Sequence, residues 1–492
     1  MRVFTLLIYL AVIAGATVAA LPVSTATMGL EEIDHWIADQ MQKHGLKGVT
    51  LAITQGEEII YLEGYGTAGR GRLITPQTPM FIGSQSKSFT GLAVAQLAER
   101  GLLDISKPVR AYIPWFTIED EAASSEITVS HLLHHTSGLS DSGFSVVLPE
   151  NASLEQGVRA LQSARITAKV GSRFQYFNMG YSVLALVIQN VSGQSYEEYI
   201  RQNILEPLHM NRTFTDPAEA ARHGLSQGYT RLFGFPIPAH QRSPVYELAA
   251  GYLISTAEDL ARFAIAMNND GVYQGNRVLS EAGMLQLFTP VQGYAMGWFV
   301  EQGHIFHGGA NETFKTFVSL YPDRGLGIVL LINQGYMLDH IVSAPQLFHG
   351  VNALILGGVP QSGGVSVQVI GWGLLALVLT LVMYQGRNIY RLRNWYTRAS
   401  MWSTAKLTCD LALHFIIPTV ILILIFSQVK GFFGDRFNLM RELVFMFRTL
   451  IDLSILIVII SVPDYGQGMI KIFWIVSNRM RRKCRNSAAG IN

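Results

Sequence analysis

The chain has 492 residues, a formal net charge of +2, 49% hydrophobic residues and only 15% charged residues. This length exceeds one typical domain, and the near-neutral charge argues against nucleic acid as a partner, because phosphate binding needs a basic face. The composition is too apolar for a soluble protein of this size and predicts membrane segments. Both cysteines, Cys409 and Cys484, lie in the C-terminal region, which excludes a disulfide framework or a thiol nucleophile elsewhere.

Residues 1–27 are typical of an export signal. Arg2 supplies the positive start, residues 4–20 form an apolar run, and residues 18–20 are small enough for a cleavage site. The apolar core is short for a membrane span, so cleavage is favoured, and an uncleaved N-terminal anchor is the alternative. A signal of either kind predicts that the following domain lies outside the cytoplasm.

Residues 28–350 are predicted to form one globular domain. Residues 49–53 and 59–62 are strand-like runs joined by a hairpin, and residues 84–98 have helical spacing. Near the end of this region, residues 317–321 and 326–332 are two more strand-like runs joined by a Pro-Asp-Arg-Gly turn. Strands at both ends with helices between them predict an α/β (α+β) domain, in which terminal strands close a sheet and a helical insertion separates them.

The C-terminal third is predicted to be a membrane region. Residues 351–364 are glycine-rich and are interpreted as a linker, followed by a transmembrane region over 365–478 and a basic tail over 479–492. Three apolar spans are expected in this region, at 365–384, 407–426 and 443–462. The third span is interrupted by Arg448 and Asp452, which either pair on one helix face or indicate that the span starts later.

Positive charge predicts the orientation of these spans. Basic loops stay in the cytoplasm, and four arginines follow the first span while five basic residues follow the third. They are Arg387, Arg391, Arg393 and Arg398, and then Arg479, Arg481, Arg482, Lys483 and Arg485. Three spans then place the tail inside and residues 28–364 outside, the side that the export signal also predicts. We therefore expect a multi-pass protein of the cell membrane with an extracytoplasmic catalytic domain, and interpret the basic tail as a topology signal.

The first chemical motif is Ser84-Gln85-Ser86-Lys87, at the start of the predicted helix. A serine hydroxyl needs a nearby base to act as a nucleophile, and a spacing of three places Ser84 and Lys87 on one helix face. The helix N-terminus also offers free N–H groups where negative charge develops. The spacing therefore suits acyl transfer, although by itself it also fits a helix cap beside an exposed lysine.

Two further motifs follow. Tyr176 and Asn178 lie in a loop before a helical run, where a phenolate near a cation can exchange protons and an amide can donate to a substrate carbonyl. His307-Gly308-Gly309 opens the strand pair near the end of the domain, and its glycines let a substrate backbone approach the strand. We expect His307 to offer a donor to a substrate carboxylate or to Tyr176. The alternatives are a packed aromatic loop and a surface histidine.

In this order and spacing, the three motifs resemble those of the serine β-lactamase and penicillin-binding-protein superfamily. His-Gly-Gly in place of Lys-Thr-Gly, together with Tyr-x-Asn, resembles its class C β-lactamase, D-aminopeptidase and esterase-like branch, as do residues 127–139 and 251–260. The resemblance covers residues 30–345. It implies a mainly antiparallel sheet flanked by helices, a mostly helical subdomain beside it, and a site between the two.

The resemblance also implies residue roles. Ser84 attacks a carbonyl and becomes acylated, Lys87 activates it alone or through Tyr176, and Tyr176 relays the proton to the leaving group. The N–H groups of Ser84 and of Ala310, the residue after Gly309, form the oxyanion hole. Neither a cofactor nor a metal is implied.

The architecture of a catalytic domain followed by three spans is similar to that of membrane peptidases that mature prodrugs by removing an N-acyl-D-asparagine group. Those enzymes carry a serine where this chain has Asn178, which weakens the transfer of their specificity. The substrate is left open between D-amino-acid peptides, β-lactams and small esters. A penicillin-binding protein or sensor that acylates with little turnover is the alternative function, and the oligomeric state is left open.

Two other patterns suggest different chemistry. Residues 224–228 match the Gly-x-Ser-x-Gly elbow of α/β-hydrolases, but that motif needs a strand before it, and the preceding residues 217–223 predict a short polar helix. The histidines 131, 134 and 135 suggest a metal site, but no His-Glu-x-x-His pattern accompanies them. We therefore expect neither an elbow nor a metal site at these positions.

Overall fold

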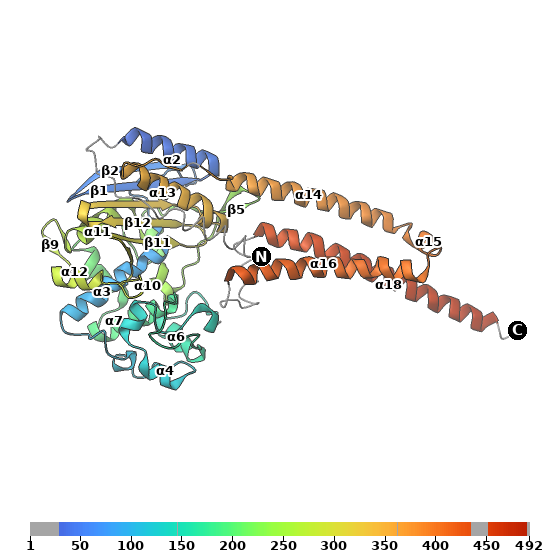
Figure 1. The fold of residues 1–492 in the computed structure, drawn as a ribbon, viewed down its shortest axis with the longest axis horizontal. Helices are drawn as coiled ribbons and strands as arrows, with labels where there is room; N and C mark the ends of the chain where they lie inside the picture. The colour runs from blue at the N-terminus through green and yellow to red at the C-terminus, as the bar shows by residue number, and fades with distance from the viewer. Residues whose placement is uncertain (1–28, 145, 362, 434–450, 490–492) are drawn as a thin grey trace. The chain divides into compact units, whose positions relative to one another are not determined.

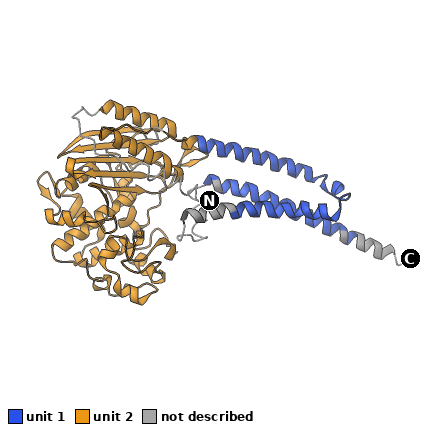
Figure 2. Cartoon of the chain, viewed as in Figure 1, with its two compact units in different colours: residues 1–21, 369–492 blue, residues 22–368 orange. Residues whose placement is uncertain are grey.

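The computed structural model describes residues 29–144, 146–361, 363–433 and 451–489 (Figure 1). The chain divides into two compact units, one formed by residues 22–368 and the other by residues 1–21 and 369–492 (Figure 2). The predicted export signal at 1–27 lies outside the described residues. The two units are taken in turn below.

A seven-stranded antiparallel sheet forms the centre of the first unit (Figure 1). Its strand order is β10-β11-β12-β13-β1-β2-β3, so strands from both ends of the unit meet where Val49 of β1 pairs with Ile332 of β13. The predicted fold class, with terminal strands that close an antiparallel sheet, is confirmed. The strands are β1 (Gly48–Gln55), β2 (Glu58–Gly69), β3 (Arg72–Leu73), β10 (Phe299–Glu301), β11 (His304–Ala310), β12 (Lys315–Tyr321) and β13 (Leu326–Ile332).

Alternating side chains of the central strands fill two cores, one on each face of the sheet. In β1, Val49, Leu51 and Ile53 pack with the helices α2 (Leu30–His44) and α13 (Ala344–Ile355), while Ala52 joins the core on the opposite face, which is covered by α11 (Ala257–Asn268). This alternation is the period-two pattern of a strand that is buried on both faces.

Helix α13 corrects one predicted boundary. The linker was expected from residue 351, but α13 continues to Ile355. Gly350 lies so close to Trp36 of α2 that an added Cβ would be 2.1 Å from its ring, and Val351 and Ile355 are buried in the same core. The Trp36 indole also donates to the Leu347 carbonyl at 3.2 Å. The helix is thus held by packing contacts that the glycine-rich composition after residue 356 obscured.

A mostly helical region lies between β4 (Met80–Phe81) and β7 (Ile254–Ser255), as the resemblance implied (Figure 1). Its central helix, α3, is buried from Ser86 to Leu97 and contacts α7, α10 and α12. The helices are α3 (Ser86–Glu99), α4 (Glu121–Glu126), α5 (Val129–Leu133), α6 (Leu154–Ala160), α7 (Asn178–Ser192), α8 (Tyr196–Ile200), α9 (Pro217–Arg222) and α10 (Leu248–Gly251), followed outside this region by α12 (Glu281–Leu287). Two small hairpins, β5 (Gly228–Leu232) with β6 (Phe235–Ala239) and β8 (Val272–Tyr273) with β9 (Asn276–Arg277), complete the unit.

The second unit consists of long apolar helices. Among the residues that the structure describes, three stretches are long and apolar enough to cross a membrane: Val367–Leu392, Thr404–Ile423 and Ser454–Asn478. They belong to α14 (Val367–Leu392), α16 (Thr404–Phe433) and α18 (Ile451–Ala489), and the short α15 (Trp395–Ala399) follows α14. The third span was predicted at 443–462; its described part, Ser454–Asn478, runs past the predicted end, and residues 443–450 lie outside the described residues. Helix α18 also runs on through the described part of the basic tail.

Candidate active site

Ser84 lies in a tight 3₁₀ turn, Gly83–Gln85, that leads directly into α3. Gly83 has a φ of +55°, and an added Cβ would lie 2.4 Å from the Ala310 nitrogen, so only glycine fits this turn. Among residues 78–97, Ser84 alone is not fully buried. The turn therefore presents one hydroxyl at the surface of an otherwise sealed core.

The Lys87 side chain is fully buried one helical turn after Ser84. Its ammonium donates to the Ser84 hydroxyl at 3.2 Å, to the Asn178 side-chain oxygen at 2.7 Å and to the Ala250 carbonyl. These three uncharged acceptors match the three N–H donors of the group. The structure thus brings Ser84, Lys87 and Asn178 together, as the motifs predicted.

Burial shifts the ionisation of Lys87. Loss of water around the amine lowers its pKa from 10.5 to about 7, and the negative charges of Glu247 and Asp141 oppose the shift. No carboxylate of the described residues forms an ion pair with it. A substantial fraction of Lys87 is therefore neutral near pH 7, and a neutral amine 3.2 Å from a hydroxyl can accept its proton.

The spacing of Tyr176 and Asn178 follows from the local backbone. Phe177 between them is extended, with φ −144° and ψ 110°, and its ring is buried against Phe144. Residues on either side of an extended residue point the same way, so Tyr176 and Asn178 both face Lys87. The Lys87 ammonium lies 4.8 Å from the centre of the Tyr176 ring. Burial raises the pKa of Tyr176, and its hydrogen bond with Ser84 opposes the shift, so the phenol is protonated at neutral pH.

Strand β11 brings Gly309 and Ala310 against the Ser84 turn. An added Cβ on Gly309 would lie 1.9 Å from the Ile82 carbonyl oxygen, which explains why glycine occupies the position. Strand β10 pairs with His304–Phe306 of β11, and the next part of β11 faces the turn instead. The backbone of Ala310 thus lies beside the segment that carries Ser84, where the resemblance places the two N–H donors of an oxyanion hole.

His307 occupies a different environment from the one predicted. It is only 2% exposed, its Nδ1 lies 2.8 Å from the Gly308 carbonyl, and its Nε2 lies 3.0 Å from the Tyr294 hydroxyl. The carbonyl can only accept, so Nδ1 carries the proton and Nε2 accepts from Tyr294. Burial, helped by the charge of Lys87, lowers the pKa of His307 to about 3. The prediction that His307 offers a donor to substrate or to Tyr176 is therefore wrong, because the imidazole is neutral and both nitrogens are occupied.

Sequence reasoning missed several residues that surround Lys87 and Tyr176. His135 has a backbone φ of +55°, packs with its ring centre 4.3 Å from that of Tyr176 and accepts a hydrogen bond at Nδ1 from the Phe177 N–H at 3.2 Å. Tyr294 packs on the other side of this aromatic group. The matching stretch at 127–139 contains His135, but no local pattern in the sequence points to Tyr294 or to Glu247.

The elbow-like motif at residues 224–228 and the histidines 131, 134 and 135 have structural explanations. Helix α9 precedes residues 224–228, as predicted, so no strand supports a nucleophile elbow there. Ser226 is 5% exposed and accepts a hydrogen bond from the Asn333 side chain at 3.0 Å. Among the neighbouring histidines, His131 caps α5 through the Thr128 N–H, and His134 lies 2.8 Å from the Ser130 carbonyl. Their Nδ1 atoms are thus engaged by the protein backbone.

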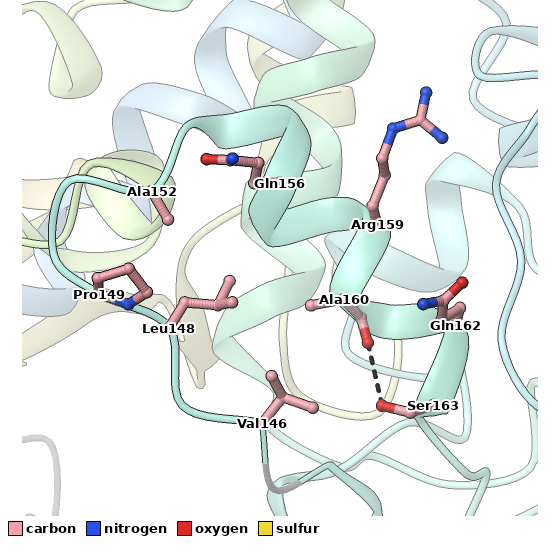
Figure 3. A pocket seen from close by; sticks show the side chains of 9 residues that line it. All are labelled: Val146, Leu148, Pro149, Ala152, Gln156, Arg159, Ala160, Gln162 and Ser163. Carbon is pink, nitrogen blue, oxygen red and sulfur yellow. Dashed lines mark hydrogen bonds between the residues drawn. The ribbon is translucent and has the colours of Figure 1, made fainter.

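A separate apolar hollow of about 430 Å³ lies in the helical region (Figure 3). It is formed by helix α6 and by the segments on either side of it, and it contains none of the predicted site residues. Its lining is Val146, Leu148, Pro149, Ala152, Gln156, Arg159, Ala160, Gln162 and Ser163. The hollow is thus distinct from the Ser84 turn.

Comparisons with known proteins agree with this fold. The Beta-lactamase family model matches residues 33–349. Protein flp of Staphylococcus aureus (strain N315) is 30% identical over 313 residues, which cover 62% of this chain and 63% of that protein, so the match leaves over a third of the relative unmatched. The octameric penicillin-binding protein homologue from Pyrococcus abyssi shares 26% identity with a TM-score of 0.60, covering 68% of this chain and 79% of its own.

A second solved structure shows the fold alone. FmtA from Staphylococcus aureus is 23% identical with a TM-score of 0.57, over 73% of this chain and 99% of its own. The family model covers more than half of the chain and includes the Ser84, Tyr176 and His307 motifs. On this evidence, the chain belongs to the beta-lactamase family.

Proposed function

We propose that this protein is a membrane-anchored serine hydrolase that cleaves an ester or amide through an acyl-enzyme on Ser84. The observation that carries the proposal is the environment of Lys87. A buried amine with its pKa lowered to about 7, at 3.2 Å from the one accessible residue of the turn, is suited to take the serine proton. Positioned proton transfer of this kind contributes roughly 10²–10⁴-fold to rate.

In the proposed reaction, the neutral amine of Lys87 takes the proton as Ser84 attacks the substrate carbonyl. The new C–O bond forms while the carbonyl electron pair moves to oxygen, where the N–H groups of Ser84 and Ala310 stabilise it. Collapse of this intermediate breaks the bond to the leaving group, which receives a proton by way of Tyr176. Water then cleaves the acyl-enzyme by the same steps, and Asn178 keeps Lys87 in place through its 2.7 Å hydrogen bond.

We further propose that the catalytic unit lies outside the cytoplasm. Three helices have the length and composition of membrane spans, and arginines cluster after the first and third of them. A reporter that functions only in the cytoplasm should be active when it is fused after residue 489. A reporter that functions only outside the cytoplasm should be active when it is inserted in the exposed turn at Gly71. The reverse pattern at both positions would contradict the proposed orientation.

The alternative is a penicillin-binding protein that acylates but hardly turns over. Intact-mass measurements on the full-length protein in detergent separate the two functions. The protein is treated with a fluorescent β-lactam and, separately, with a phenyl ester. An adduct that forms and disappears with product release supports a hydrolase, and a stable adduct supports the binding protein.

Two serine variants test the nucleophile in the same assay. Ser84→Ala should abolish the adduct and the hydrolysis, and Ser226→Ala, the serine of the decoy elbow, should leave both unchanged. Hydrolysis that survives in Ser84→Ala would overturn the proposal.

A further inference from the structure

Glu247 lies beside the lysine network but takes no part in it. It ends the 3₁₀ turn Val245–Glu247 that leads into α10, the helix whose Ala250 carbonyl accepts from Lys87. Helix α10 also contacts the Ser84 turn, and the Gly251 carbonyl accepts from the Asn311 side chain at 3.2 Å, next to Ala310. Glu247 is therefore held within electrostatic range of Lys87, and its charge raises the pKa of that lysine.

The Glu247 carboxylate lacks a partner. In the part of the chain that the structure describes, it forms no hydrogen bond and no ion pair, although it is only partly exposed. Burial raises its pKa to about 7. The three N–H donors of Lys87 are already used by Ser84, Asn178 and Ala250. Carboxylates so placed normally have a hydrogen-bonding partner, so this one is open to a donor from outside the protein.

Charged groups of both signs lie near the Glu247 carboxylate, and the cations among them are Lys87 and Arg242. Asp141 and Glu312 lie close enough to raise the pKa of Glu247 by their own charge. The nearby cation Arg242 is engaged by Glu150 at 2.8 Å. A positively charged group that enters here would be attracted by the Glu247 carboxylate, and an anionic group would be repelled by it.

The histidine of the third motif offers no charge to an anion. His307 stands where the resemblance has the Lys-Thr-Gly lysine, and it is neutral, 2% exposed and bonded to Gly308 and Tyr294. A substrate carboxylate would therefore lose its water without gaining a charged partner there, which costs free energy.

We propose that Glu247, with Asp141 nearby, binds a positively charged group of the substrate, so that the protein acts on esters or amides that carry an ammonium group near the scissile carbonyl. This inference rests on the proposed hydrolase function and names its substrate class. A protonated amine would give Glu247 a charge-assisted hydrogen bond and would fix the carbonyl beside Ser84. Carboxylate-bearing β-lactams are expected to react poorly at the same site.

Two pairs of isosteric phenyl esters test the proposal with the full-length protein in detergent at about pH 7.5. Phenyl β-alaninate and phenyl butanoate differ by an ammonium in place of a methyl group. Phenyl alaninate and phenyl isobutyrate differ in the same way, with the ammonium one bond closer to the scissile carbonyl. The readout is the ratio of kcat/KM, amine over neutral ester, from phenol release. We expect a ratio of at least about ten in one pair, since one charge-assisted contact commonly gives tenfold or more.

Variants at Glu247 assign this preference. Glu247→Gln should lower the ratio at least about tenfold by slowing the amine ester, while phenyl butanoate should react no more slowly than in the wild type, and Glu247→Asp should restore part of the ratio. The exposed strand residue Glu58 provides the matched control, and Glu58→Gln should leave the ratio unchanged.

Three results would overturn the inference. They are a ratio near one in both pairs, a ratio that Glu247→Gln leaves intact, and an equal loss on amine and neutral esters, which would make Glu247 part of the chemistry. Acylation of Ser84 by phenyl butanoate is measured separately in every case. Failure of the substrate-class inference can therefore be distinguished from failure of the proposed hydrolase function.

Discussion

Two of the cations buried in the first unit, Arg231 and Lys87, have opposite surroundings. Arg231, on β5, is fully buried and holds Asp339 with two hydrogen bonds of 2.8 and 2.9 Å, while its other N–H groups donate to the Gly234 and His44 carbonyls. Lys87 is just as buried, but its three acceptors are a hydroxyl, an amide and a carbonyl. Among the described residues, Arg231 has a full counter-charge in contact and Lys87 has none.

The difference separates a structural charge from a reactive one. In a buried ion pair, removal of one partner leaves the other charge buried and unpaired. A buried lysine without a carboxylate in contact is easier to deprotonate, which lowers its pKa to about 7. Burial of Lys87 without a counter-charge thus lowers the stability of the fold. The same burial lets the lysine act as a base at neutral pH.

Removal of the reactive lysine should produce the largest change. We expect Lys87→Met to lower kcat/KM for a neutral phenyl ester by roughly 10³–10⁴-fold, because the serine loses its base while the apolar side chain fills the same space. The measurement is phenol release by the full-length protein. Lys107→Met, at an exposed position, is the control and should match the wild type. A fall of less than about tenfold in Lys87→Met would contradict the assignment of Lys87 as the base.

Removal of the structural arginine should affect stability instead. Arg231→Met leaves the Asp339 carboxylate buried without its charge partner, so we expect a loss of about 3–5 kcal/mol in the free energy of unfolding, with kcat/KM of the folded fraction unchanged. Urea unfolding followed by fluorescence measures it. The double variant Arg231→Met with Asp339→Leu should recover most of the loss. If Arg231→Met were as stable as the wild type, the ion pair of Arg231 would not be structural, and the contrast between Arg231 and Lys87 would be wrong.

The stability effect of Lys87 should depend on pH. Its pKa is about 7 when folded and about 10.4 when unfolded, so between these values the unfolded state binds more protons and stability rises with pH. Below pH 7 the full penalty of the buried charge is present. We therefore expect Lys87→Met to be more stable than the wild type at pH 6, and the gap to narrow by roughly 2 kcal/mol between pH 7 and 9. A gap that is constant over this range would show that the pKa of Lys87 is not lowered.

A lysine of the second unit should behave like Arg231, with a smaller effect. Lys471 of α18 donates to Asp410 of α16 at 2.7 Å and lies 2.6 Å from His414, so it has a counter-charge in contact. We expect Lys471→Met to weaken the α16–α18 pairing by about 0.6–2 kcal/mol, the usual range for polar contacts between membrane helices. Unfolding in mixed detergent micelles measures this change. Loss of ester hydrolysis in Lys471→Met would instead indicate a catalytic role that this account does not assign.

The sequence predicted the parts of the fold that depend on local pattern. Apolar strand-like runs identified β1 and β13, and the Ser-x-x-Lys spacing identified one face at the start of α3, because the helix period determines which side chains share a face. The end of α13 was missed. It depends on packing contacts, such as Gly350 against Trp36, that composition does not reveal.

The candidate site was predictable only in part. Ser84, Lys87, Tyr176 and Asn178 carry recognisable spacings, and the structure brings them together. The state of His307 could not be read from its motif, because its neutrality comes from burial and from Tyr294, which no local pattern links to it. Glu247 was missed for the same reason, since its proximity to Lys87 arises from the docking of α10 on the Ser84 turn.

The most direct test of the central claim is the pH dependence of Ser84 acylation by neutral phenyl butanoate, followed by intact mass in the wild type, Lys87→Met and Glu247→Gln. The account predicts that acylation rises with pH with a midpoint of about 7 in the wild type, because the neutral amine is the base. In Glu247→Gln the midpoint should fall, since the carboxylate charge that raises the pKa of Lys87 is gone, and in Lys87→Met this inflection should be absent. A wild-type profile that is flat from about pH 5.5 to 9, or the same inflection in Lys87→Met, would contradict the claim that Lys87 activates Ser84.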